Sequence, residues 1–252
     1  MDNEAQSKSI WVVIPAAGVG RRMQSDIPKQ YLKIQGKTVL EHTVSRFTLL
    51  PQVAGVLVIV SEADAHWNEL ESTLVNDCRD KETLLMVTYG GVDRSSTVAK
   101  GLAFLLDEKK LALEQWVMIH DAARPCVLKA DLLNLMSMRQ VLNKDSGAIL
   151  AIPVRDTLKQ AGDDKIVLTT QSRDALWQAQ TPQLFTLGVL YDALNKASHA
   201  GVLITDDASA LEYDRKQVHL VEGSSSNIKL TTPSDLAIIE FLLKGIEGKD
   251  AV

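Results

Sequence analysis

Cysteine is scarce in this chain of 252 residues, and the two present, Cys78 and Cys126, form no CxxC motif. Two thiols are too few for a disulfide framework, so we interpret them as reduced core residues. The sequence also has no run of about 18 or more apolar residues, which argues against a membrane-spanning helix. Residues 1–10 carry three charged side chains and no apolar run. We therefore expect neither a signal peptide nor a transit peptide, and a cytoplasmic location without a membrane partner.

Positively charged residues are also fewer than negatively charged ones. Lys and Arg number 27 against 32 Asp and Glu, which gives a formal net charge of −5. Domains that coat nucleic acid through bulk charge are usually basic, so we expect no nucleic-acid partner. The apolar fraction of 46% and the charged fraction of 23% are typical of globular proteins rather than disordered ones. We predict that residues 1–252 form a single domain with a full hydrophobic core.

Short apolar runs recur along the chain, and most are followed by a longer amphipathic stretch. Runs without alternation are typical of strands that are buried on both faces. The predicted strands are Trp11–Ile14, Val56–Val60, Leu84–Val87, Trp116–Ile119 and Ala148–Ile152. The predicted helices are Thr38–Leu49, Ala65–Leu74, Thr97–Leu106, Leu132–Leu142, Leu187–Ala197 and Pro233–Leu243. The alternation predicts an α/β fold with a doubly wound, mostly parallel sheet, in which ligands bind at the carboxyl ends of strands.

The alternation of predicted strands and helices is interrupted at about residues 153–182. Two β-rich segments, Thr157–Lys159 and Ile166–Thr169, flank a polar turn at residues 161–164. This pattern predicts a β-hairpin, and its mostly polar positions suggest an arm that projects from the body. A projecting hairpin with one apolar side needs a partner to cover that side. We therefore infer a homodimer that forms through the arm.

The loop after the first predicted strand combines small residues with positive charge. It reads Pro15-Ala16-Ala17-Gly18-Val19-Gly20-Arg21-Arg22-Met23 and continues to Pro28-Lys29-Gln30-Tyr31-Leu32. Small residues let backbone N–H groups approach an anion closely. Residues 20–37 contain one acid, Asp26, against the cations Arg21, Arg22, Lys29, Lys33 and Lys37. This local excess suggests a polyphosphate ligand, although the loop matches neither a Walker A nor a GxGxxG motif, and a solvated basic loop is the alternative.

Other predicted loops carry polar residues that suit a ligand. His120-Asp121-Ala122-Ala123-Arg124-Pro125 follows a strand, where the carboxylate could hold a metal, a sugar hydroxyl or the arginine. Residues 90–97 place glycines before hydroxyls, which suits contact with a base or a ribose. No G-x-S-x-G motif supports a catalytic triad with the histidine. Taken singly, each segment also fits a plain cap or turn. Later polar segments are Arg155–Thr157, Arg173, Thr181–Gln183, Thr205–Asp207 and Asn227–Lys229.

Taken together, the motifs resemble those of the 2-C-methyl-D-erythritol 4-phosphate cytidylyltransferases over about residues 12–239. The matching motifs are Pro-Ala-Ala-Gly-x-Gly-x-Arg-Met, Pro-Lys-Gln-Tyr-Leu, Leu-Glu-His, His-Asp-Ala-Ala-Arg-Pro, Pro-Val-Arg-Asp-Thr, Thr-Pro-Gln, Thr-Asp-Asp-Ala-Ser-Ala and Asn-Ile-Lys. The resemblance implies a Rossmann-like domain with a protruding β-arm and a homodimer. It also implies a Mg²⁺-dependent transfer in non-mevalonate isoprenoid biosynthesis, in which CTP and the sugar-alcohol phosphate form 4-diphosphocytidyl-2-C-methyl-D-erythritol and pyrophosphate.

The resemblance further implies roles for individual residues. The implied catalytic residues are Arg22, Lys29, Arg173 and Lys229. Arg22 and Lys29 match transition-state-stabilising cations, and Lys229 matches a residue that steers the attacking phosphate. The implied nucleotide-binding residues are Pro15, Ala16, Ala17, Gly18, Gly20, Gly91, Thr97, Asp121 and Ala122. The implied substrate-binding residues are Arg124, Thr157, Thr181 and Thr205, and Thr157 and Arg173 would reach the site of the partner subunit. No residue is implied as a metal ligand. The sequence departs from some relatives in having Val92 and Thr97 where these carry an acid and a serine.

The chemistry of such a transfer agrees with these residues. A phosphate monoester is largely dianionic at neutral pH, so it attacks without a general base. The reaction needs positioning and fixed positive charge, which Arg22, Lys29, Lys229 and Mg²⁺ would supply. The alternatives are a cytidylyltransferase for another polyol phosphate such as ribitol 5-phosphate, a hexose-1-phosphate nucleotidyltransferase, and an inactive nucleotide-sensing module. The alanines in Ala16–Gly18 and Ala122–Ala123 favour methylerythritol phosphate over ribitol phosphate.

Overall fold

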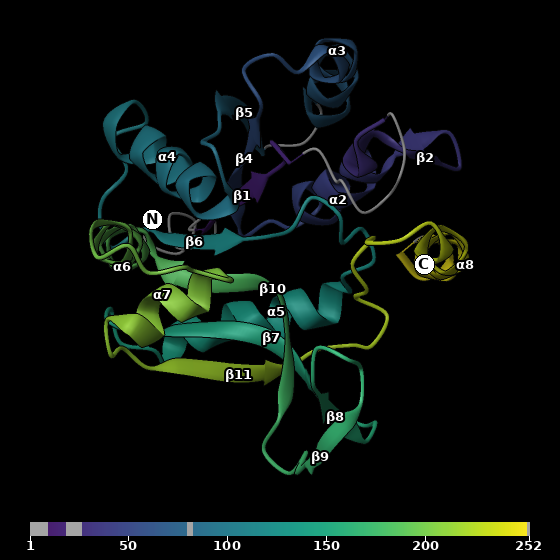
Figure 1. Cartoon of the computed structure of the whole chain (residues 1–252). Helices are drawn as coiled ribbons and strands as arrows, with labels where there is room; N and C mark the ends of the chain where they lie inside the picture. The colour runs from purple at the N-terminus through teal and green to yellow at the C-terminus, as the bar shows by residue number, and fades with distance from the viewer. Residues whose placement is uncertain (1–9, 19–26, 80–82, 251–252) are drawn as a thin grey trace.

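A seven-stranded sheet in the order β11-β7-β10-β6-β1-β4-β5 forms the centre of the molecule (Figure 1). The computed structural model describes residues 10–18, 27–79 and 83–250. Strand β1 (Ile10–Pro15) pairs in parallel with β4 (Val53–Val60) on one side and with β6 (Trp116–Ile119) on the other. Strand β5 (Leu84–Tyr89) extends this parallel half beyond β4. The apolar runs thus predicted these four strands correctly.

In the other half of the sheet, one of the described strands runs antiparallel to its neighbours. Strand β10 (Trp177–Thr186) runs antiparallel to both β6 and β7 (Gly147–Pro153), and β11 (Val218–Glu222) pairs in parallel with β7. The fold prediction of a mostly parallel, doubly wound α/β sheet is therefore confirmed. Strands β10 and β11 were not predicted. The first three residues of β10 are exposed and the rest are buried, so neither alternation nor a continuous apolar run marks it.

Helices cover both faces of the sheet, because side chains of each strand point alternately to opposite faces. In β1, Val12 and Ile14 join one core cluster, while Trp11 and Val13 join the other. The first cluster packs against α2 (Val39–Thr48), α3 (Ala65–Arg79) and α5 (Lys129–Ser137). The second packs against α4 (Arg94–Asp107), α6 (Leu187–His199) and α7 (Asp207–Tyr213). Both cysteines are buried, as expected.

The helix boundaries differ from the sequence prediction at several places. Helix α2 begins after Thr38, whose side chain forms a capping box with Glu41. The helix predicted over Leu132–Leu142 is α5, which ends at Ser137 and continues as a 3₁₀ turn. Helix α8 (Ser234–Asp250) is longer than predicted, and its Ile239 packs in a third small core. Among the helices of the described residues, none combines the length and hydropathy needed to cross a membrane.

The predicted hairpin is present as a separate two-stranded sheet. Strand β8 (Leu158–Ala161) pairs antiparallel with β9 (Val167–Gln171), and Figure 1 shows both extending away from the central sheet beside the start of β10. Neighbouring apolar side chains on this arm are exposed, among them Ile166 at 63%, Val167 at 57% and Leu168 at 65%. The hairpin prediction is therefore confirmed, and the arm has apolar surface that its own chain leaves uncovered.

Candidate active site

A pocket of about 400 Å³ opens beyond the carboxyl ends of β1 and β6. These strands are neighbours, but the chain leaves β1 toward β4 and reaches β6 on the opposite side. They form a topological switch point, where open α/β sheets bind ligands. The predicted site residues that line the pocket are Pro15, Ala16, Ala17, Gly18, Lys29, Gly91, Thr97, Asp121, Ala122 and Lys229. The pocket is also lined by residues that are not among the predicted site residues: Gln30, Val92, Asp93, Arg94, Ala123 and Thr231.

Gln30 holds the small-residue loop that follows β1. It lies on the 3₁₀ turn Lys29–Tyr31, and its side-chain amide donates hydrogen bonds to the main-chain oxygens of Ala16 (2.7 Å) and Gly18 (3.0 Å). The buried amide thereby satisfies two loop carbonyls and fixes the shape of the main chain. Its neighbour Lys29 then lies at the pocket wall, where its ammonium donates to the oxygen of Leu230 at 2.9 Å. Arg22 and Gly20 lie outside the described residues.

The glycine turn after β5 is shaped by Thr97. The Gly91 N–H donates to Thr97 Oγ1 at 3.1 Å, and the same hydroxyl donates to the Asp93 carbonyl at 2.6 Å. A side chain at Gly90 would place its Cβ 2.9 Å from both the Cβ of Ala17 and Thr97 Oγ1. Glycine is therefore needed for the turn to approach the β1 loop. The Thr97 hydroxyl is committed to this turn, and Val92 is fully exposed.

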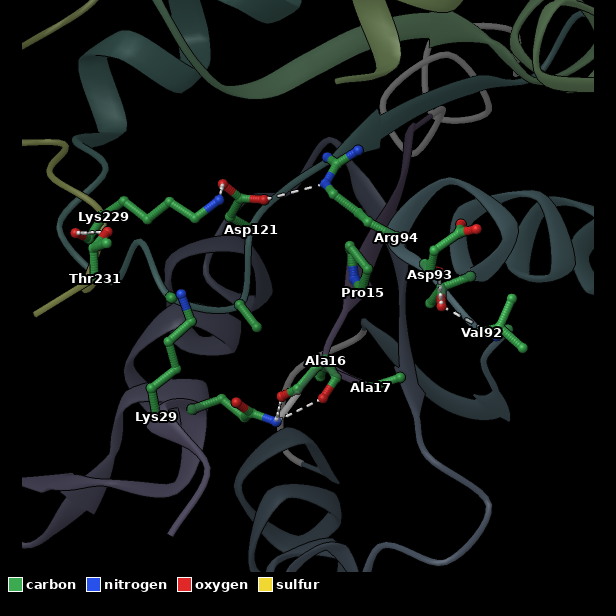
Figure 2. A pocket seen from close by; sticks show the side chains of 16 residues that line it. Pro15, Ala16, Ala17, Lys29, Val92, Asp93, Arg94, Asp121, Lys229 and Thr231 are labelled. Carbon is green, nitrogen blue, oxygen red and sulfur yellow. Dashed lines mark hydrogen bonds and ion pairs between the residues drawn. The ribbon is translucent and has the colours of Figure 1, made fainter. Parts of the chain in front are cut away.

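Asp121 is the centre of a cluster of positive charges. Its Oδ2 lies 2.7 Å from the Lys229 ammonium and 3.3 Å from Arg124 Nε, and its Oδ1 lies 3.6 Å from Arg94 Nε. Figure 2 shows Lys229 and Arg94 reaching this carboxylate from different sides. Burial alone would raise the pKa of Asp121, but the three cations outweigh burial and hold that pKa well below its usual range. Asp121 is therefore a permanent carboxylate that organises cations and is unsuited to accept a proton.

Arg94 also pairs with a second acid, Asp207. Its two terminal nitrogens lie 3.1 and 2.7 Å from the two oxygens of Asp207, which is completely buried. Burial raises the pKa of Asp207, and the Arg94 charge opposes this effect. A two-pronged arginine–carboxylate pair fixes the guanidinium in both position and plane. No local sequence pattern indicates this pair, because the partners are 113 positions apart.

Two predicted substrate residues lie behind the pocket wall rather than in it. Thr181 is buried, and its Oγ1 accepts a hydrogen bond from the Asp121 N–H at 3.0 Å. The Arg124 guanidinium donates to the main-chain oxygen of Asn227 at 2.6 Å. His120 is also fully buried, which lowers its pKa to about 4. The histidine therefore stays neutral at physiological pH.

The remaining predicted substrate residues do not line this pocket. Thr157 lies just before β8, and Arg173 follows β9, where its guanidinium donates to the main-chain oxygen of Arg155. Both are exposed on the arm. Thr205 is exposed before α7, and its N–H donates to the Ser209 hydroxyl at 3.2 Å. One chain by itself thus brings together the described nucleotide residues but not the arm residues.

Comparisons with known proteins match nearly the whole chain. A family model described as 2-C-methyl-D-erythritol 4-phosphate cytidylyltransferase matches residues 10–245. The protein of that name from Vibrio vulnificus (strain CMCP6) is 46% identical over 235 residues, which are 93% of this chain and 94% of the relative. The one from Pseudoalteromonas atlantica is 44% identical over 92% and 94% of the two chains. The crystal structure of the Francisella tularensis enzyme is similar with a TM-score of 0.76, at 35% identity over 93% of this chain and 100% of that one.

Proposed function

Because the chain belongs to the 2-C-methyl-D-erythritol 4-phosphate cytidylyltransferase family, we propose that the switch-point pocket is where it joins CTP to that sugar-alcohol phosphate. The reaction gives 4-diphosphocytidyl-2-C-methyl-D-erythritol and pyrophosphate, in isoprenoid biosynthesis. One observation supports the location above all. Every described residue that the motifs indicated for the nucleotide lines this one pocket, together with Lys29 and Lys229.

The proposed reaction is a displacement at the α-phosphorus of CTP. An oxygen of the sugar-alcohol phosphate forms the new bond, and the bond to the bridging oxygen breaks with its electrons leaving on pyrophosphate. The nucleophile is already anionic and gives up no proton. The neutral, buried His120 and the permanently charged Asp121 agree with a reaction that uses no general base.

Positive charge carries most of the proposed catalysis. Lys29 and Arg22 would stabilise the charge that develops around the α-phosphate, and Lys229 would draw the attacking phosphate toward it. Lys229 is suited to this exchange because its side chain keeps 36% exposure while it pairs with Asp121. Arg94 is different, because its guanidinium is already paired with the carboxylates of Asp207 and Asp121. We propose that Arg94 supports the site and leaves phosphate binding to the lysines.

The nucleotide would be held mainly by main chain. The small loop of residues 15–18 and the glycine turn lie on the same pocket wall and bring backbone within reach of a ligand. Gln30 and Thr97 stiffen these two segments through their hydrogen bonds to the main chain. A rigid backbone cradle reduces the ordering cost of binding a flexible triphosphate.

We propose that Mg²⁺ enters as its complex with CTP. The described residues contain no group of three or more His, Cys, Asp or Glu side chains that could form a cage. The two pocket acids are also engaged, Asp93 with Ser95 and Ser96 and Asp121 with its cations. These observations fit the usual behaviour of Mg²⁺ in nucleotide enzymes, where the phosphates supply many of the ligands. In that complex the ion supplies charge neutralisation on the triphosphate, and we assign no described residue as its ligand.

The arm supports the proposal of a homodimer. Its exposed apolar residues would be covered by a second copy, and Thr157 and Arg173 do not line the pocket of their own chain. We propose that these two residues complete the polyol-phosphate site of the partner subunit. The chain has two cysteines, both buried, which is typical of a protein from a reducing compartment and supports a cytoplasmic location.

The identity of the product tests the proposed function. Purified protein with CTP, Mg²⁺ and methylerythritol phosphate should give the two coupled ³¹P resonances of a diphosphate diester together with pyrophosphate. A cytidylyltransferase for ribitol 5-phosphate would give this product pattern only with ribitol 5-phosphate. A nucleotide-sensing module would bind CTP and give neither signal.

A further inference from the structure

A line of buried polar groups runs directly behind the pocket wall. His120 Nε2 lies 3.0 Å from the main-chain oxygen of Arg124, and His120 Nδ1 lies 3.0 Å from Thr181 Oγ1. The same hydroxyl oxygen accepts the N–H of Asp121 at 3.0 Å. His120 is 0% exposed and Thr181 5% exposed, so protein groups rather than bulk water supply these hydrogen bonds.

The chemistry of each group fixes where the protons lie. A carbonyl oxygen only accepts, so His120 Nε2 must carry a proton and donate it to Arg124. In a neutral ring Nδ1 then has only a lone pair, so the Thr181 hydroxyl donates to Nδ1. Its oxygen remains an acceptor for the Asp121 N–H. The three hydrogen bonds therefore agree on a single arrangement of protons.

Thr181 is also tied to the segment that carries Lys229. The main-chain oxygen of Thr181 accepts a hydrogen bond from the side-chain amide of Asn227 at 2.8 Å. The main-chain oxygen of Asn227 in turn accepts from the Arg124 guanidinium at 2.6 Å. Thr181 thus connects the end of β6 with the segment that leads to Lys229. Both members of the Asp121–Lys229 ion pair are supported from this one threonine.

We propose that His120 and Thr181 are positioning residues, and that the neutral histidine directs the threonine hydroxyl so that it fixes the main chain of Asp121. Asp121 in turn places the cations around it. In this assignment Thr181 acts through Asp121 and does not touch either substrate, because its hydroxyl donates to His120 and accepts from the Asp121 N–H. The effect on turnover rests on the proposed function, whereas the placement of the protons does not.

Nuclear magnetic resonance of protein labelled with ¹⁵N-histidine tests the proton placement without any assay of activity. The His120 signals are identified by their absence from the His120→Gln variant. At pH 7 the wild-type ring should show the neutral form with its proton on Nε2. Thr181→Val should shift the Nδ1 resonance, while Thr181→Ser should leave it near the wild-type position. A ring protonated on Nδ1 would overturn the proposal.

Kinetics test the consequence for the reaction. Thr181→Val should lower kcat by about 10- to 100-fold through misplacement of Asp121, with the KM of each substrate within about threefold of wild type. Thr181→Ser should recover most of this loss. Thr83→Val is the matched control, because it removes another buried threonine hydroxyl next to the amino end of β5, and it should leave kcat within about twofold of wild type.

A raised KM with unchanged kcat in Thr181→Val would indicate a substrate contact and overturn the positioning role. Equal losses in the Val and Ser variants would also contradict it, because serine keeps the hydroxyl. If wild type itself shows no turnover, the proposed function fails, and the resonance experiment still decides the proton placement. The wild-type spectrum and the Ser variant keep the test intact even if the Val variant does not fold.

Discussion

The Lys29 ammonium donates a 2.9 Å hydrogen bond to the main-chain oxygen of Leu230, the residue that follows Lys229. This contact joins the turn after the β1 loop to a segment from the far end of the chain. Two proposed cations, Lys29 and Lys229, are thereby set on the same wall of the pocket (Figure 2). The site is assembled from both ends of the sequence, so its charge depends on the completed fold.

Replacement of Lys29 should abolish most of the turnover. Lys29→Ala removes a fixed positive charge from the pocket, and loss of one such group commonly lowers the rate by about 10²- to 10³-fold. The far-ultraviolet circular dichroism spectrum should match wild type, because the core does not depend on this side chain. Steady-state release of pyrophosphate gives the rate.

Lys33→Ala serves as the control for that experiment. Lys33 is a nearby exposed cation on the short strand β2 (Lys33–Ile34) and does not line the pocket. Its replacement changes net charge by the same amount and should leave kcat near wild type. Near-normal turnover in the Lys29 variant would refute the assigned role.

Mixed dimers should recover activity that neither parent variant has. Arg173→Ala disables the arm, and Lys29→Ala disables the pocket. In a heterodimer of the two, one site receives both lesions and the other receives none. Random mixing should therefore restore up to about a quarter of wild-type activity, since half of the dimers carry one intact site out of two. Absence of recovery, with subunit exchange verified by mass spectrometry, would argue against a site shared between subunits.

Removal of Arg94 should destabilise the fold as well as the site. Arg94→Ala leaves the completely buried Asp207 without its partner, which should lower the free energy of unfolding by about 3–5 kcal/mol. Lys244→Ala breaks an exposed pair with Glu240 and should leave stability near wild type. Urea denaturation measures both variants.

A double-mutant cycle then isolates the Arg94–Asp207 interaction. Adding Asp207→Asn to Arg94→Ala removes the stranded charge, so the double variant should be less destabilised than the sum of the two single changes. Strict additivity would show that the pair contributes no coupling and would contradict this description of Asp207.

His120 should make stability depend on pH. Burial lowers its folded-state pKa to about 4 from an ordinary value of 6.5, so between these values the unfolded chain binds more protons than the native one. The free energy of unfolding should therefore fall as pH drops from about 6.5 to 4, with a slope approaching 1.4 kcal/mol per pH unit. Above about pH 6.5 this contribution is constant. Urea denaturation at a series of pH values measures it.

The comparison variant for the pH series is His120→Gln, which lacks the titrating ring. Asp121, Arg124 and Lys229, the charged groups around the ring, are the same in both proteins. The stability difference between wild type and variant should shrink toward acid pH. Parallel curves would mean that His120 titrates normally in the native protein.

The strands that are buried on both faces were predictable from sequence, and the polar ones were not. β1 and β4 are continuous apolar runs because helices cover both of their faces. β10 contains buried Gln180, Thr181 and Gln183, whose polar groups are satisfied by distant residues. Such partners are set by the tertiary fold, so nothing local in the sequence marks this strand as core.

Only part of the pocket lining could be predicted from the sequence, as was the case for the strands. Motif residues on the loops after β1 and β6 meet because both loops leave the same edge of the sheet. The roles of Gln30 and Arg94 were missed, since each depends on a contact with a segment that is remote in sequence. Thr181 was predicted as a substrate residue from its place in a motif. Its burial and its hydrogen bonds support the different, positioning role that we propose.

A matrix of pyrophosphate release tests the proposed reaction most directly. Purified protein with Mg²⁺ is assayed with CTP, ATP, GTP and UTP, each against methylerythritol 4-phosphate and ribitol 5-phosphate. We predict release only with CTP and methylerythritol 4-phosphate. Release with ribitol 5-phosphate instead, or no release from a folded protein that still binds CTP, would refute the proposed function.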